Sequence, residues 1–146
     1  MELRAKMEQL NTCICKMTEL YRTWAKRHGM SYNTMMTLYA LGQSLKCTQK
    51  QIADEWLIPK QTVNTVIKEL ERLGHISFEP LPGSKQKIVC LTESGRAYAD
   101  SCLHELYEME SRALRSLGQP LTDIFIECNL AFAERLEEEV RGHAGE

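Results

Sequence analysis

The sequence predicts a mainly α-helical protein with a small β-hairpin wing, that is, a winged helix-turn-helix with N- and C-terminal dimerisation helices. Three observations predict this fold class. Apolar residues recur at three- and four-residue steps over most of the chain. Two short helical patterns between residues 48 and 74 are separated by only a few residues, as in a helix-turn-helix. Two β-prone segments around a Pro- and Gly-rich turn follow directly, as expected for a hairpin.

Length and composition limit the possible classes. A chain of 146 residues allows one compact domain, or one small domain with oligomerisation elements. The hydrophobic content of 43% is ordinary for a soluble globular protein. No apolar run approaches the roughly 20 residues that span a bilayer, and the charged N-terminus is unlike a signal peptide. We therefore expect a cytoplasmic protein without a membrane partner, and its six scattered cysteines are typical of free thiols.

A first helix is predicted over about residues 5–27. Its apolar residues follow heptad spacing: Leu3, Met7, Leu10, Ile14, Met17, Tyr21 and Trp24. Such a seam needs a partner, either the C-terminal helices or a second subunit. We therefore divide the chain into dimerisation helices at 1–30 and 118–146, a winged helix-turn-helix at 31–92 and a long linking helix at 93–117.

A second helix, over about residues 32–44, begins after Ser31 as its N-cap. It is rich in Met and Tyr, which pack into cores and also line sites for flat, apolar ligands. Both interpretations remain open at this point. The second one predicts a site for a small aromatic or apolar effector formed by Trp24, Tyr32, Met35, Met36 and Tyr39.

The helix-turn-helix is predicted from local signals. Thr48 and Gln51 have the spacing of a capping box at the start of its first helix. Pro59 fits the first position of its second helix, where a missing N–H costs nothing. Gly74 ends that helix in left-handed geometry. The strands of the wing are predicted at 76–79 and 87–91, and Thr92 caps a helix that runs to about residue 117. A last helix is predicted over about 121–140.

One face of the helix at 59–74 is apolar and the opposite face carries amide, hydroxyl and cationic groups, which suit phosphates and base edges. Gln61 and Asn64 are the expected base readers, because amide side chains can pair with adenine through two hydrogen bonds. Glu69 and Glu71 oppose phosphate, so we expect the C-terminal half of the helix to leave the DNA. The full set of expected DNA-binding residues is Thr48, Gln49, Lys50, Lys60, Gln61, Thr62, Asn64, Thr65, Lys68, Lys85, Gln86 and Lys87.

These segments together resemble the MarR family of bacterial transcriptional regulators over essentially the whole chain. The most specific matches are TQKQIADEW, PKQTVNTVIKELERLGHI and the ending VCLTESG. The resemblance implies a homodimer with interlocked terminal helices that binds double-stranded DNA at a near-palindromic operator, as a ligand-responsive repressor. Family members often carry an Asp-x-Arg pair in the wing, whereas this chain has Gly83 and Lys85 there. Lysine keeps the charge of arginine and lacks its planar fork.

Two other functions are considered. Cys15, beside Lys16, is a possible redox sensor, while Cys13 lies on the apolar stripe, where a buried thiol is inert. The altered wing also allows a winged-helix protein-interaction module without DNA binding. Enzymatic and metal functions are not expected. The sequence has no Gly-rich phosphate loop and no G-x-S-x-G motif, and its cysteine and histidine spacing does not match a zinc site. We expect no catalytic residue, no metal and no cofactor.

Overall fold

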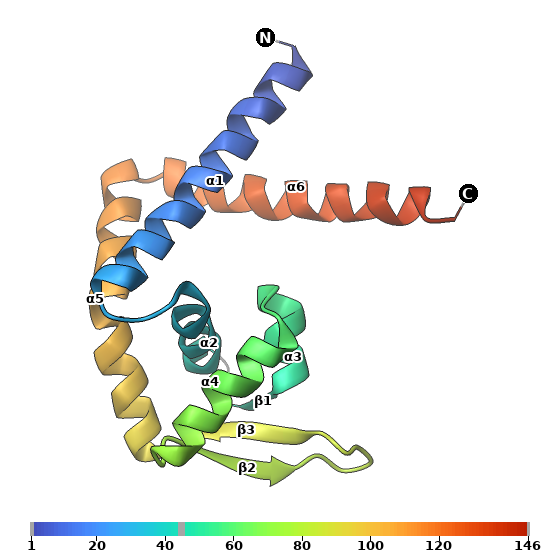
Figure 1. The fold of residues 1–146 in the computed structure, drawn as a ribbon. Helices are drawn as coiled ribbons and strands as arrows, with labels where there is room; N and C mark the ends of the chain where they lie inside the picture. The colour runs from blue at the N-terminus through green and yellow to red at the C-terminus, as the bar shows by residue number, and fades with distance from the viewer. Residues whose placement is uncertain (1, 44–45, 146) are drawn as a thin grey trace. The chain divides into compact units, whose positions relative to one another are not determined.

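The computed structural model describes residues 2–43 and 46–145. The chain forms two compact units, Met1–His104 and Glu105–Glu146. The elements of the first unit are α1 (Leu3–Arg27), α2 (Tyr32–Gln43), β1 (Lys46–Thr48), α3 (Gln49–Trp56), α4 (Lys60–Arg72), β2 (Ile76–Pro80), β3 (Lys87–Leu91) and the beginning of α5 (Glu93–Leu117) (Figure 1). The second unit contains the end of α5 and α6 (Leu121–His143).

The three strands form one antiparallel sheet in the order β1-β3-β2. Val89 of β3 is fully buried at its centre, with Cys47 opposite it on β1 and Phe78 opposite it on β2. The predicted hairpin is therefore present, with one more residue in its first strand. The sequence did not predict β1, which adds a third strand to the sheet. A strand of three residues is too short to show an alternating pattern.

The core of the first unit lies between α2, α3, α4 and the sheet. The apolar positions of α4 that the periodicity predicted as one face, Val63, Val66, Ile67 and Leu70, are all buried. The facing side chains of α2, Met35, Leu38 and Leu41, are at most 1% exposed. Burial of each such side chain contributes roughly 1.5–3 kcal/mol, so this contact fixes α4 on the unit.

The beginning of the helix-turn-helix confirms one prediction and corrects another. The Thr48 hydroxyl accepts the Gln51 N–H at 3.1 Å, and the Gln51 side chain accepts the Thr48 N–H at 2.8 Å, which completes the predicted capping box. Pro59 was predicted as the first helical residue and is instead the N-cap of α4, with an extended ψ of 135°. Its carbonyl accepts the N–H groups of Thr62 and Val63, so the ring precedes the first turn.

Hydrogen bonds connect the end of α4 to the beginning of α5. Gly74 has φ +76°, as predicted for the residue that ends the helix. The Thr92 hydroxyl donates to the Gly74 carbonyl at 2.8 Å and accepts the Gly95 N–H at 3.0 Å, which confirms Thr92 as a helix cap. The Thr92 N–H also donates to the His75 carbonyl at 3.0 Å. One threonine therefore connects α4, β2 and α5.

Apolar side chains remain exposed on α1 and α6 of the single chain. On α1, Trp24 at the C-terminal end is buried, whereas Leu3, Ile14 and Met17 of the predicted heptad seam are exposed. No described residue of α6 is buried. Its exposed apolar side chains are Leu121, Ile124, Phe125, Ile126, Leu130, Phe132, Leu136 and Val140. Within the described residues, no helix is long and apolar enough to cross a membrane.

Candidate nucleic-acid interface

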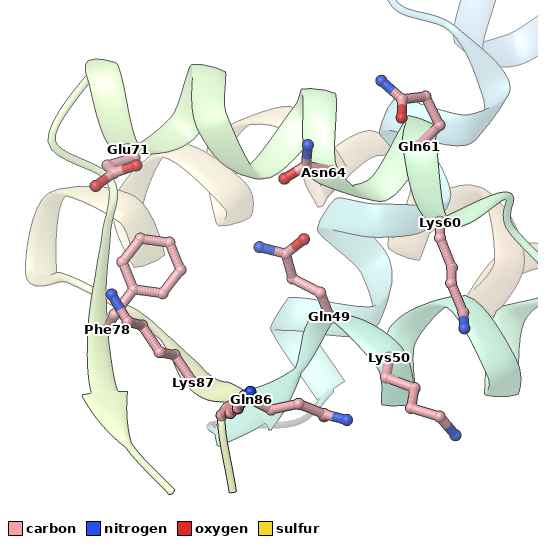
Figure 2. A pocket seen from close by; sticks show the side chains of 10 residues that line it. Gln49, Lys50, Lys60, Gln61, Asn64, Glu71, Phe78, Gln86 and Lys87 are labelled. Carbon is pink, nitrogen blue, oxygen red and sulfur yellow. The ribbon is translucent and has the colours of Figure 1, made fainter.

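A groove of about 670 Å³ runs between α4, the start of α3 and the wing (Figure 2). Its lining residues are Gln49, Lys50, Lys60, Gln61, Asn64, Glu71, Phe78, Lys85, Gln86 and Lys87. Eight of these ten belong to the set that the sequence predicted for DNA binding. Residues that are up to 38 positions apart in the chain therefore line one concave surface.

The α4 helix contributes Lys60, Gln61 and Asn64 from its first turns. Val63 and Ile67 of the same helix are fully buried, and this burial fixes the rotation of the helix about its own axis. Amide groups from one helix face can form paired hydrogen bonds with base edges, and a lysine beside them can meet a phosphate.

The start of α3 contributes Gln49 and Lys50 on the other side of the groove. The Lys50 ammonium lies 2.8 Å from the Asp54 carboxylate, which holds the pKa of that carboxyl below its usual range. Thr48, which we predicted as a DNA contact, is only 5% exposed, and its hydroxyl is occupied by the cap. Thr48 therefore positions the residues that follow it and does not face the groove.

The wing contributes Lys85, Gln86 and Lys87. Gly83 has φ +77° in its turn, a conformation that glycine adopts without strain. The Gln86 N–H donates to the Ser84 hydroxyl at 3.0 Å, which orders the tip. The Lys87 ammonium lies 5.7 Å from the centre of the Phe78 ring, within the range of a cation–π interaction.

Three other predicted residues of α4 do not line this groove. Thr62 is half-buried, and Thr65 is exposed with its hydroxyl donating to the Gln61 carbonyl at 2.9 Å. Lys68 is exposed. They remain predicted contacts for a DNA backbone at the edge of the groove.

Two lining residues, Glu71 and Phe78, were not predicted as site residues. Glu71 follows Asn64 by seven residues, two helical turns along the same face, so the spacing could have indicated it. Phe78 lies on β2, and only the packing of the hairpin against α4 brings it into the groove. In the view of Figure 2, Glu71 and Phe78 lie at one end of the groove, and Lys50 and Lys60 at the other.

The five residues predicted for an effector site lie on α1 and α2, and none lines the groove. Met35 is fully buried. Trp24 stacks on His28 with ring centres 3.9 Å apart, and Tyr39 packs edge-to-face on Trp56 at 5.4 Å. These side chains contribute to the packing of the first unit.

Two further residues belong to the same predicted site. Tyr32 is half-buried, and the Arg22 guanidinium lies 4.6 Å from the centre of its ring. Met36 is half-buried on α2. An aromatic ring beside a cation is a suitable surface for a flat, anionic molecule.

The cysteines differ in their exposure to solvent. Cys13 and Cys15 are exposed, so the predicted burial of Cys13 is wrong for the single chain, where the α1 seam has no partner. Cys47 and Cys90 are buried on β1 and β3. Burial raises the pKa of the Cys47 thiol to about 11, with a smaller contribution from the charge of Glu55. A thiol with such a pKa stays protonated at neutral pH and reacts poorly. Among the described residues, no group of His, Cys, Asp and Glu could hold a metal ion.

Comparison with known proteins shows a similarity to one family. Residues 28–87 match the MarR family by sequence. A MarR family regulator from Neisseria meningitidis is 28% identical, with a TM-score of 0.79 over 94% of this chain and 98% of that one. The transcriptional regulator BldR from Sulfolobus solfataricus is 17% identical, with a TM-score of 0.71 over 92% of this chain and 99% of that one.

A third solved structure contains small molecules. MarR of Staphylococcus aureus in complex with salicylate and kanamycin is 19% identical, with a TM-score of 0.69 over 94% of this chain and 95% of that one. A search of curated proteins found no significant match. Members of the matched family are transcription regulators and not enzymes. The segment that matches the MarR family contains the helix-turn-helix, and the chain has the winged helix-turn-helix fold of solved MarR family transcriptional regulators.

Proposed function

We propose that this protein is a homodimeric, ligand-responsive repressor that binds a near-palindromic operator in double-stranded DNA. The observation that carries the proposal is the groove that the amide residues of α4 and the lysines of the wing line together. Gln61 and Asn64 read base edges in the major groove, while Lys60, Lys85 and Lys87 meet phosphates on both sides. Lys60, Lys85 and Lys87 form no salt bridge among the described residues, so their charges are available to DNA.

The apolar surfaces of α1 and α6 support the dimer. Residues such as Ile124 and Phe132 on α6, and Ile14 on α1, are exposed in the single chain. A second copy is the partner that would cover them, because a two-fold interface uses the same surface on both subunits. The α4 helices of the two subunits, as the recognition helices, then face half-sites about one helical turn apart. Sedimentation of an Ile124→Asp variant tests this arrangement. We expect a monomer in place of a dimer, and a wild-type monomer would contradict it.

The DNA test starts from a randomised duplex library. Sequences that the wild-type protein recovers serve as the operator, and a shuffled duplex of the same composition serves as random DNA. We expect Asn64→Ala to weaken binding to the recovered operator more than binding to random DNA, since each bidentate base contact contributes about 1–3 kcal/mol of discrimination. Equal weakening on both duplexes would contradict the assignment of Asn64. No binding to either duplex at low salt would contradict DNA binding itself.

The proposed effector is a small aromatic acid. The Arg22–Tyr32 pair supplies a cation and a ring, and Trp24, Met35, Met36 and Tyr39 supply the apolar surface. A ligand bound there releases DNA by changing the distance between the two recognition helices. Thermal stabilisation by salicylate tests the site, with Tyr32→Ala as the variant and Tyr98→Ala as the control on α5. Equal stabilisation in all three proteins would count against this site.

A further inference from the structure

The groove contains one carboxylate among its ten lining residues. Glu71 lies on the same face of α4 as Asn64, two turns further along. It is exposed, and among the described residues it forms no ion pair. The other charged residues of the lining are lysines. A DNA strand in this groove therefore meets cations along its edges and a single uncompensated negative charge at the end near Phe78 (Figure 2).

The neighbouring Glu69 shows the contrast. Its two carboxylate oxygens accept hydrogen bonds from the Arg72 guanidinium at 2.6 and 2.9 Å, and this partner lowers the pKa of Glu69. Glu69 does not line the groove, and its charge is compensated by a partner on its own helix. Glu71, by contrast, lines the groove and has no such partner among the described residues. The two carboxylates are two residues apart in the chain and have different surroundings.

We infer that Glu71 is a specificity-determining residue that excludes phosphate from one end of the DNA-binding groove. This inference rests on the proposed function. Binding to random DNA depends almost entirely on phosphate contacts and tolerates many positions of the backbone. A carboxylate at this position penalises arrangements of the DNA backbone that bring a phosphate to its end of the groove. The operator complex, with its phosphates at the lysines and its bases at Gln61 and Asn64, avoids that penalty. Such a repulsive element increases the ratio of operator to random affinity.

The test is a Glu71→Gln variant, titrated by fluorescence anisotropy with the recovered operator and the shuffled duplex. At low salt we expect affinity for the shuffled duplex to rise about threefold, since two like charges within several ångströms repel by that order in a wet groove. Affinity for the operator rises less, so the ratio of the two affinities falls. Glu71→Asp keeps the charge and is expected to keep the ratio.

Glu69→Gln is the matched control, because it changes the net charge of the protein by the same amount outside the groove. We expect it to leave the ratio of affinities unchanged. An unchanged or increased ratio in Glu71→Gln would overturn the inference, as would an equal fall in both variants. A selective loss of operator binding in Glu71→Gln would also overturn it, since Glu71 would then be a base reader. Failure of the proposed function gives a different result, namely a wild-type protein that binds neither duplex.

Discussion

Gly95 approaches the carbonyl group of His75 so closely that a Cβ on Gly95 would lie 1.7 Å from the His75 oxygen. This contact joins the first turn of α5 to the residue after Gly74, where α4 has ended and the wing begins. The Thr92 hydroxyl, which bonds Gly74 and Gly95, holds the same junction. The first turn of α5 is therefore held against the end of α4 and the start of the wing.

A Gly95→Ala substitution tests this contact. The added methyl group meets backbone atoms, which cannot rotate away, so the junction must open. We expect the free energy of unfolding to fall by about 1–3 kcal/mol or more, as for other overpacked sites. Gly142→Ala on α6 is the control, because nothing lies within 4 Å of a Cβ at that position. Urea unfolding should show no loss for the control, and equal losses in both variants would contradict the close contact.

Leu57 in the turn between α3 and α4 is 89% exposed and has φ +51°. Leucine in this left-handed region is strained, whereas asparagine tolerates it. We expect Leu57→Asn to raise the free energy of unfolding by about 0.5–1 kcal/mol. By contrast, Ile58→Ala removes a buried side chain and should lower it by roughly 2–5 kcal/mol. Thermal unfolding checks both. A less stable Leu57→Asn protein would mean that the exposed side chain has a contact within the assembled protein.

A substitution of Thr48 distinguishes a role in helix capping from a direct contact with DNA. Loss of its capping box in Thr48→Ala should lower the free energy of unfolding by about 1 kcal/mol. The salt dependence of DNA binding should stay as in the wild type, because the Thr48 side chain is buried and reaches no phosphate. Unfolding and DNA titration are measured on the same preparation. Weakened DNA binding with unchanged stability would restore Thr48 as a direct contact.

Cys47 gives a prediction about alkaline stability. Its pKa is about 11 in the folded protein, against an ordinary value of 9.0. The unfolded chain therefore loses this proton first, and the free energy of unfolding falls as pH rises from about 9 towards about 11. Below about pH 9 the Cys47 thiol is protonated in both states and does not change the free energy of unfolding with pH. A Cys47→Ala variant should lose less stability over the same range in urea unfolding. Identical pH dependence in the two proteins would show that the thiol is not buried.

The sequence predicted those parts of the fold that depend on neighbouring residues. The Thr48 cap, the Gly74 terminus and the buried face of α4 each follow from side chains within one or two turns. β1 could not be predicted, because three residues give no pattern and their pairing with β3 is set by the rest of the unit. In the site, Gln61 and Asn64 were predicted from one helix face. Phe78 enters only through tertiary packing, which a one-dimensional pattern does not contain.

If the groove binds the phosphates of DNA, as we propose, the affinity for DNA must depend strongly on salt concentration. For the wild type, the logarithm of the binding constant should fall linearly and steeply with the logarithm of salt concentration. Lys60→Gln and Lys85→Gln should each reduce the magnitude of this slope by about 1, since each removes one phosphate contact. Lys16→Gln, on α1 outside the groove, should keep the wild-type slope. Equal slopes in all four proteins would contradict the binding of DNA phosphates by Lys60 and Lys85.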